Sequence, residues 1–429
     1  MFFLIIYVVK NGDSLYEISQ IYGVSVDEIS YVNMLETPDK LVIGQSLIIP
    51  IKSYTHIVQR GESIYGISRH YNVSIDDILK LNPNITNPGN ILPGEVLNIP
   101  GDNKNRKTID VNGYAYANIS DSTLDRSLPY LTYIAPFSYQ VQGDGSLTRL
   151  QDNNILSRAF SINTVPLLVI TNIKSTGGFD SELAKTILTN QNIQNELLDN
   201  IETELETKGF GGINIDFEYI YPENREDYNS FLQRVADRFK PMGYLILTSL
   251  APKTSKNQQG TLYEAHDYDF HGSVADKVII MTYEWGYTYS SPMAVAPVNE
   301  VRKVLDYAVS AIPSSKILMG LSNYGYDWKI PYQKGVPARA ISNLNALNLA
   351  VKNNSAINFD NVASAPYFNY VDNEGKQHVV WFEDARSYNE RLKLISEYNL
   401  GGTSIWTINN LFRPLFEILE SQYIVYKRN

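Results

Sequence analysis

Apolar and polar residues alternate along the segment 211–218, Gly-Gly-Ile-Asn-Ile-Asp-Phe-Glu. Because the side chains of a β-strand point alternately to its two faces, this pattern predicts a strand with one apolar face. Helical patterns on both sides of it favour a parallel strand covered by helices over a solvent-exposed edge strand. The apolar face then holds Ile213, Ile215 and Phe217, and the opposite face holds Asn214, Asp216 and Glu218.

Apolar strands and amphipathic helices alternate from Thr108 to the end of the chain. Eight such strands predict an α/β fold, the (β/α)8 barrel, whose active site lies at the carboxyl ends of the strands. The expected strands are 109–113, 130–135, 165–171, 212–217, 244–250, 277–281, 316–321 and 402–405. The clearest helical patterns cover 180–208, 225–239, 298–311 and 387–398.

The gap between the seventh and eighth strands is unusually long. It holds two strand-like runs, 365–371 and 378–382, around the turn sequence Asp-Asn-Glu-Gly. Such a turn between apolar runs is typical of a hairpin. We therefore expect a small α+β insertion at about 330–382.

The first hundred residues contain a repeat. The segment 7–15 matches the segment 56–64, which lies 49 positions later (61 − 12 for the shared glycine), and 44–50 matches 94–100. Each copy predicts a strand, a helix capped by Asp13 or Ser14, a helix opening at Ser25 or Asp27, and a closing strand. We expect two small βααβ units at 1–50 and 54–100, a polar linker at 101–107, and a catalytic domain at 108–429.

Both copies of this repeat resemble the LysM module. The Gly-Asp/Glu-Ser opening and the Gly-x-x-Leu-x-Ile-Pro close are present in each. The resemblance implies binding of glycans that contain N-acetylglucosamine, such as peptidoglycan and chitin. The alternative is a pair of small folds that mediate only protein contacts.

Composition narrows the possible partners and cofactors. A net charge of −10 and a pI of about 5.1 argue against a nucleic-acid partner, because phosphate binding needs clustered Lys and Arg. Cysteine is absent and the five histidines show no ligand spacing, so neither a metal nor another cofactor is expected. The apolar start, 1–9, lacks a basic leader and a cleavage site and is too short to span a bilayer. We expect no signal peptide and no membrane association.

Polar and aromatic residues gather where the expected strands end. Two carboxyl groups two residues apart on one strand lie roughly 7 Å apart, between the separations of retaining and inverting glycosidases, so spacing leaves the stereochemistry open. A carboxylic acid beside another and against apolar walls should have a raised pKa, which suits a general acid. The candidates are Asn214, Asp216, Glu218, Tyr283, Glu284, Trp285, Asn323, Tyr324, Tyr326, Trp406 and Tyr139.

The run 213–218, the Met-x-Tyr at 281–283, Trp406 and the Ser-Thr-Gly-Gly at 175–178 resemble glycoside hydrolase family 18. The resemblance implies that Glu218 is the proton donor, that Asp216 holds the substrate acetamido group, and that Trp406 forms the floor. Tyr283 would hydrogen-bond the acetamido carbonyl, whose oxygen would be the nucleophile, giving net retention.

Three positions depart from the family pattern. Gly211 and Asn214 stand where the family signature has Asp, and Glu284 replaces the usual Asp after the tyrosine. Because Asn214 cannot share a proton, we expect Asp216 to keep its charge. Intact Asp216 and Glu218 argue against a non-catalytic relative.

Two LysM-like units before such a barrel resemble a narrower group, the spore cortex-lytic N-acetylglucosaminidases of the SleL/YaaH type. This implies cleavage of the β-1,4 bond after N-acetylglucosamine in cortex peptidoglycan during germination. It also implies a location in the spore, at the boundary of coat and cortex. Separately, we expect a monomer. The alternatives are a chitinase, an endo-β-N-acetylglucosaminidase acting on N-linked glycans, and a non-catalytic glycan-binding coat protein.

Overall fold

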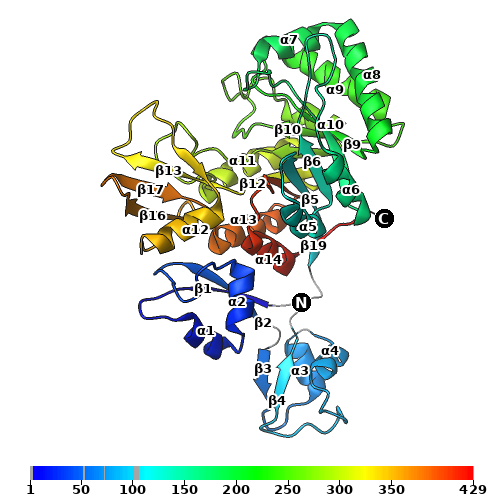
Figure 1. The fold of residues 1–429 in the computed structure, drawn as a ribbon. Helices are drawn as coiled ribbons and strands as arrows, with labels where there is room; N and C mark the ends of the chain where they lie inside the picture. The colour runs from blue at the N-terminus through cyan, green and yellow to red at the C-terminus, as the bar shows by residue number, and fades with distance from the viewer. Residues whose placement is uncertain (1–2, 52–53, 72, 101–105, 429) are drawn as a thin grey trace.

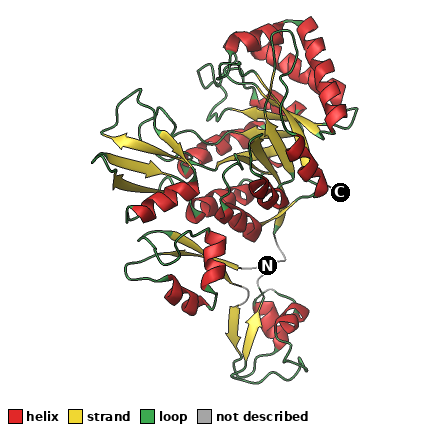
Figure 2. Ribbon diagram, in the orientation of Figure 1, coloured by secondary structure: helices red, strands yellow, loops and turns green. Residues whose placement is uncertain are grey.

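The larger part of the chain forms a closed barrel of eight parallel strands (Figures 1 and 2). The computed structural model describes residues 3–51, 54–71, 73–100 and 106–428. The pairing of β18 with β5 closes the barrel, and each barrel strand overlaps an expected one, which confirms the predicted fold class. The barrel strands are β5 (Lys107–Tyr116), β6 (Tyr133–Phe137), β8 (Val165–Thr171), β9 (Gly212–Asp216), β10 (Leu245–Leu250), β11 (Lys277–Ile280), β12 (Ile317–Ser322) and β18 (Gly402–Trp406).

Helices surround the barrel. The helices predicted at 225–239 and 298–311 are observed with the same bounds. The segment 180–208, predicted as one helix, forms two. The cause is Asn190, whose backbone is extended (ψ 106°) and whose side chain caps the second helix by accepting the N–H groups of Asn192 and Ile193. The helices are α5 (Asp121–Ser127), α6 (Asn153–Ser161), α7 (Ser181–Thr189), α8 (Gln191–Lys208), α9 (Arg225–Phe239), α10 (Tyr268–Val274), α11 (Val298–Ala311), α13 (Ala385–Glu397) and α14 (Arg413–Gln422).

Short elements complete this part. Strand β7 (Tyr139–Gln140) pairs with β8, and β19 (Tyr423–Val425) pairs with the start of β5. Single 3-10 turns are η1 (Leu128–Tyr130), η2 (Pro222–Asn224) and η3 (Ser314–Lys316). Among the described residues, no helix is both long and apolar enough to cross a membrane.

The alternating pattern of β9 has the predicted result. Ile213, Ile215 and Phe217 are fully buried in the core cluster shared with α8 and α9. Asn214 and Asp216 point to the other side, into the barrel, and are also buried. The strand therefore separates an apolar core from a polar interior.

The expected insertion lies between β12 and β18. Its five-stranded antiparallel sheet begins at Gly325, a few residues before the expected start, and one helix packs on it. The predicted hairpin forms between β16 and β17. The elements are β13 (Gly325–Ile330), β14 (Arg339–Ile341), α12 (Asn343–Lys352), β15 (Asn358–Asp360), β16 (Ala365–Val371) and β17 (Gln377–Trp381).

Both N-terminal repeats have the predicted βααβ order. The buried Asn33 joins the second helix to the closing strand by bonding both backbone groups of Ile48 at 2.7 Å, and Asn82 bonds Asn98 in the same way. Most of the expected linker 101–107 lies outside the described residues. The repeats comprise β1 (Phe3–Val8), α1 (Leu15–Tyr22), α2 (Val26–Asn33) and β2 (Ser46–Ile51), then β3 (Tyr54–Ile57), α3 (Ile64–His70), α4 (Ile75–Leu81) and β4 (Val96–Ile99).

The first repeat packs against the catalytic domain, beside α13 and α14 (Figure 1). Val32 joins the core cluster of the barrel, and Val42 joins the cluster of α12 and the insertion sheet. The equivalent residues of the second repeat, Leu81 and Leu92, are 38% and 56% exposed. The same fold is thus docked in one copy and presents exposed apolar side chains at those positions in the other.

Two equivalent glycines offer a direct test of this docking. Gly44 and Gly94 have similar positive φ angles, +80° and +92°, but a Cβ at Gly44 would lie 1.8 Å from the carbonyl oxygen of Ile357. A Cβ at Gly94 would meet nothing within 4 Å. Alanine should cost about 1–2 kcal/mol at either site for the left-handed backbone. At Gly44 the clash should cost about 1–3 kcal/mol more.

We therefore predict that Gly44→Ala lowers the free energy of unfolding of the catalytic domain clearly more than the matched control Gly94→Ala does. Denaturant unfolding followed by tryptophan fluorescence measures it. Equal losses in the two variants would contradict a docked first repeat.

Candidate active site

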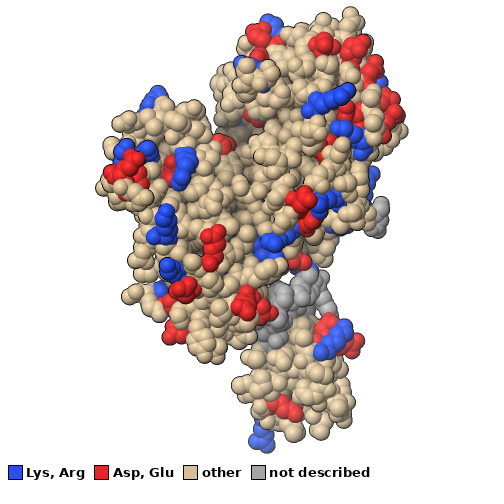
Figure 3. All heavy atoms as spheres, viewed as in Figure 1, with Lys and Arg blue, Asp and Glu red and all other residues tan. Residues whose placement is uncertain are grey.

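A cavity of about 610 Å3 opens at the carboxyl ends of the barrel strands, where Figure 3 shows a hollow between the lobe of α7 and α8 and the insertion. Five of the residues singled out in the sequence line it: Asp216, Glu218, Tyr283, Glu284 and Trp406. Aromatic residues supply much of the remaining wall, namely Tyr114, Tyr116, Phe137, Phe179, Tyr219, Tyr263 and Tyr287. An aromatic wall with a few carboxyl groups suits a sugar chain better than a polyanion. On the face drawn in Figure 3, acidic and basic side chains are interspersed.

The two central carboxyl groups come from the end of β9. Asp216 is the last residue of the strand and Glu218 lies two residues further on. Asn172, just after β8, accepts the N–H of Glu218 at 3.0 Å and donates to its carbonyl oxygen at 2.8 Å. This amide therefore fixes the backbone from which the Glu218 side chain projects.

Burial dominates the electrostatics of this pair. Desolvation raises the pKa of Asp216 to about 7, although a hydrogen bond from Ser249 opposes the change. Desolvation also raises the pKa of Glu218 well above its ordinary value, and the charges of Asp216 and Glu284 raise it further. The acidic neighbours of Glu218 favour it as the group that keeps a proton. We expected Asp216 to stay charged because of Asn214; burial opposes that charge and the hydrogen bond from Ser249 supports it, so the expectation stays a prediction.

Asn214 belongs to a chain of hydrogen bonds that ends at Asp216. Its amide donates to the Tyr114 hydroxyl at 2.5 Å, and that hydroxyl lies 2.9 Å from the Ser249 oxygen. The Ser249 hydroxyl donates to Oδ1 of Asn214 at 3.2 Å, and its contact with Asp216 lowers the pKa of that carboxyl group. The other oxygen of Asp216, Oδ1, is buried and has no partner among the described residues. One side of the carboxyl group is thus held by the protein and the other faces no protein donor.

Trp406 is held edge-on by three aromatic rings. The ring centroids of Tyr114, Tyr116 and Phe137 lie 5.2, 5.9 and 4.7 Å from that of Trp406, with interplanar angles of 69–82°. Edge-to-face contacts leave the faces of an indole ring free to stack. Trp406 therefore offers a fixed platform in the cavity.

Glu284 lines the cavity and is held by two tyrosines outside it. The hydroxyls of Tyr324 and Tyr326 both donate to Oε1 of Glu284, the second at 3.1 Å. Burial raises the pKa of Glu284, and these two hydrogen bonds lower it. Tyr324 and Tyr326 thus hold a cavity-lining carboxyl group and do not themselves line this cavity.

Three expected substrate contacts lie elsewhere. Tyr139 is fully buried in the core, where it bonds Asp152 at 2.5 Å. The amide of Asn323 is used by the carbonyl oxygens of Thr407 and Asn410, each at 2.8 Å. Trp285 packs against the barrel core. A position near a strand end predicts closeness to the site, but not the direction of the side chain.

Several functional residues escaped the sequence reasoning. Tyr114, near the end of the first barrel strand, is 2% exposed in the core cluster inside the barrel, and it also lines the cavity. Asn172 and Ser249 also follow or end barrel strands, but as neutral polar residues they carried no chemical pattern. Their roles depend on neighbours that only the fold brings together.

The described residues contain no group of three or more His, Asp or Glu side chains placed to hold a metal ion. His266 bonds the carbonyl oxygen of Phe217 at 3.0 Å and the N–H of Ala251 at 2.9 Å, and burial lowers its pKa to about 4. It is a neutral structural histidine beneath the site.

Comparisons with known proteins agree with this geometry. The family Glycosyl hydrolases family 18 matches residues 114–410, and the LysM domain matches residues 7–50 and 56–100. The chain is 42% identical to the cortical fragment-lytic enzyme of Bacillus subtilis over 99% of each chain. It is 33% identical to the putative sporulation-specific glycosylase YdhD of the same organism, over 96% of this chain and 97% of the relative.

One solved structure is similar to this chain over its whole length. The spore cortex-lytic enzyme SleL of Bacillus megaterium superimposes with a TM-score of 0.90 at 39% identity, with each chain fully covered. The residues that line the cavity therefore stand in a glycoside hydrolase.

The electrostatic coupling within the site predicts a pH effect. The charge of Glu284 raises the pKa of Glu218, so Glu284→Gln should lower that pKa. Loss of the protonated acid would then begin at lower pH, and the alkaline limb of kcat/KM should move to lower pH. The rate on the acid side should change little.

A pH series on a soluble glycan fragment measures this shift. Glu374→Gln, in the insertion hairpin and outside the cavity, is the matched control and should leave the profile unchanged. An alkaline limb that stays in place in Glu284→Gln would mean that Glu218 does not control it.

Proposed function

The chain belongs to glycosyl hydrolases family 18 and carries two LysM domains, and on this premise we propose that it is a retaining N-acetylglucosaminidase of spore-cortex peptidoglycan. It would hydrolyse the β-1,4 bond after N-acetylglucosamine. One observation carries the proposal: Glu218, with its raised pKa, shares an aromatic cavity with Asp216, whose Oδ1 has no partner among the described residues. The 42% identity to a cortical fragment-lytic enzyme supports the choice of glycan.

In the first step, protonated Glu218 gives its proton to the glycosidic oxygen as the bond from that oxygen to C1 breaks. The acetamido oxygen of the same sugar forms the new bond to C1, giving an oxazolinium ion and a free leaving group. Oδ1 of Asp216 is free to accept the acetamido N–H, and its charge stabilises the positive ring. Tyr283, whose pKa burial raises well above its usual value, stays a neutral hydroxyl donor to the acetamido oxygen.

In the second step, water attacks C1 on the face from which the leaving group departed. The Glu218 carboxylate takes a proton from this water, and the bond from C1 to the acetamido oxygen breaks. Two displacements at C1 give net retention, and Glu218 returns to its protonated form. Trp406 supports the reacting sugar from below as its platform.

We assign the nucleophile to the acetamido oxygen and not to Asp216. The spacing of the two carboxyl groups leaves the stereochemistry open. The assignment rests on membership of glycosyl hydrolases family 18 and on Oδ1 of Asp216, which has no partner among the described residues and can accept the acetamido N–H.

The two repeats would bind the glycan, and the enzyme would act in the spore, at the boundary of coat and cortex, during germination. No cofactor enters this mechanism. A chitinase shares the site chemistry, and the similarity to cortex-lytic relatives favours cortex glycan over chitin.

Mass spectrometry of products from spore-cortex glycan tests this proposal, with wild type beside Glu218→Gln. We expect wild-type fragments that end in reducing N-acetylglucosamine, and at least a hundredfold lower rate in the variant, since general acid catalysis contributes roughly 10²–10⁴-fold. Asp227→Asn, on α9, is a control of similar chemistry that should retain activity.

The other outcomes separate the alternatives. Products that end in reducing muramic acid would mean that the enzyme cleaves the bond after muramic acid and not the bond after N-acetylglucosamine. Cleavage of chitin oligomers alone would favour a chitinase. Binding of cortex glycan without products from either protein would favour a coat protein that only binds.

A further inference from the structure

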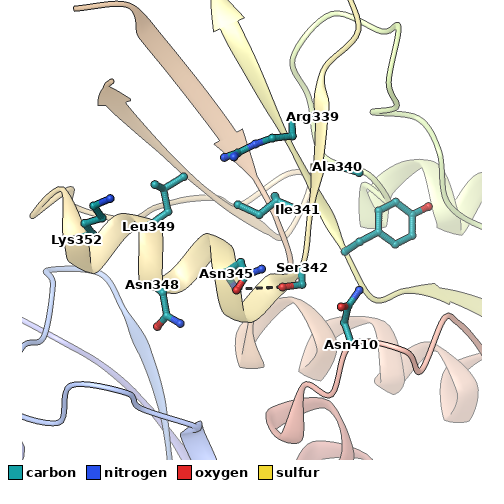
Figure 4. Close-up of a pocket in the computed structure, with 10 residues that line it drawn as sticks. Arg339, Ala340, Ile341, Ser342, Asn345, Asn348, Leu349, Lys352 and Asn410 are labelled. Atoms are coloured by element: carbon teal, nitrogen blue, oxygen red, sulfur yellow. Dashed lines mark hydrogen bonds between the residues drawn. The ribbon is translucent and has the colours of Figure 1, made fainter. Parts of the chain in front are cut away.

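A second cavity, of about 560 Å3, lies between the insertion and the loop that follows β18 (Figure 4). We call it the side cavity. Helix α12 supplies Asn345, Asn348 and Lys352, the strand before the helix supplies Arg339, and the loop supplies Asn410. In Figure 4, Leu349 and Lys352 point from α12 toward the side of β14, Asn348 points away from that strand, and Asn410 lies near the start of the helix.

Helix α12 has two chemically distinct faces. Asn345, Asn348 and Lys352 recur at spacings of three and four residues and form one stripe. Ala346 and Ala350 form the other face, fully buried against the insertion sheet and Val42 of the first repeat. The apolar face holds the helix in place, and the stripe is left to the side cavity.

The polar groups of the side cavity are available to a ligand. In the described part of the chain, no residue hydrogen-bonds the side chains of Asn345, Asn348, Asn410 or Lys352. None of the described residues lining the cavity is acidic, in a chain with a net charge of −10. Arg339 pairs with Asp327 at 2.8 Å, so Lys352 is the uncommitted cation. The lining combines positive charge with carboxamides, which both donate and accept hydrogen bonds.

The side cavity adjoins the active site through two links. The ring of Tyr324 lines the side cavity, while its hydroxyl donates to Glu284, which lines the catalytic cavity. Asn323 binds the carbonyl oxygens of Thr407 and Asn410, so the loop from Trp406 to the side cavity has a fixed course. Tyr324, which lines the side cavity, thus contacts a residue that lines the catalytic cavity.

We propose that the side cavity binds the carboxylate-bearing arm of a sugar near the cleaved bond. This inference rests on the proposed function, because alternate sugars of peptidoglycan carry a lactyl ether that ends in a carboxylate or in a short peptide. Lys352 pairs with the carboxylate, and Asn345 and Asn348 bond the amide groups beside it. Chitin has no such arm, so the side cavity separates the two glycans.

Calorimetry on the full chain tests this, with Glu218→Gln as parent protein so that no ligand is cleaved. The probes are a peptidoglycan tetrasaccharide with free lactyl carboxylates, its methyl ester, and chitotetraose. We expect the carboxylate form to bind roughly 2–5-fold tighter than the ester, the range of an exposed ion pair, and less so at high salt. Lys352→Ala should abolish this preference and Lys352→Arg should keep it. Lys334→Ala, outside the cavity, is the matched control.

A tetrasaccharide with peptides attached separates the two sources of the carboxylate. If the peptide tightens binding and Asn348→Ala removes that gain, the peptide arm occupies the side cavity; otherwise the lactyl group does. A preference that survives Lys352→Ala, or no preference at all, would overturn the proposal.

The outcome is independent of the bond that is cleaved. If the active enzyme fails to cut cortex glycan while Lys352 still discriminates carboxylate from ester, the proposed function falls and the side cavity remains a carboxylate site. If cortex glycan is cut but Lys352 does not discriminate carboxylate from ester, the carboxylate site is rejected and the proposed function stands.

Discussion

The structure depends on two carboxyl groups held away from water at the end of one strand. Burying such groups costs several kcal/mol each in effective terms, and the raised pKa values of Asp216 and Glu218 express that cost. The surroundings reduce it unequally. Asp216 receives the chain of hydrogen bonds that starts at Asn214, whereas Glu218 gains only repulsion from its acidic neighbours. This asymmetry favours Glu218 as the acid and Asp216 as the stabiliser.

Packing in the barrel stabilises the strand that carries these carboxyl groups. Ile213, Ile215 and Phe217 anchor the reverse face of β9 in a fully buried cluster with α8 and α9, so the strand cannot slip to expose its polar face. Asn172, just after the neighbouring strand β8, fixes the turn after Asp216. Packing therefore sets the position of the backbone, and the carboxyl groups do not have to hold the strand in place.

Much of this could be predicted from residue patterns. Apolar runs that alternate with helical patterns located all eight barrel strands, and the resemblance to a known family singled out Glu218 and Asp216. Sequence patterns did not predict the direction of a side chain or its contacts with residues far away in the sequence. Tyr139 lies near a strand end, yet it turns into the core to meet Asp152. Asn190 interrupts a continuous helical pattern because its side chain caps the next helix. The link from Asn214 to Asp216 joins three strands far apart in sequence.

The docking of the first repeat is the clearest case, because the sequence contains its own control. The copies share their strands and helices, and they differ in what Val32 and Val42 meet. By packing behind α12, the first repeat supports the helix whose other face lines the side cavity. Under the proposed function, a docked glycan-binding unit and the catalytic cavity would hold one chain in a set direction, whereas the second repeat would act through local concentration. Two copies of one fold can thus contribute differently, one to register and one to attachment.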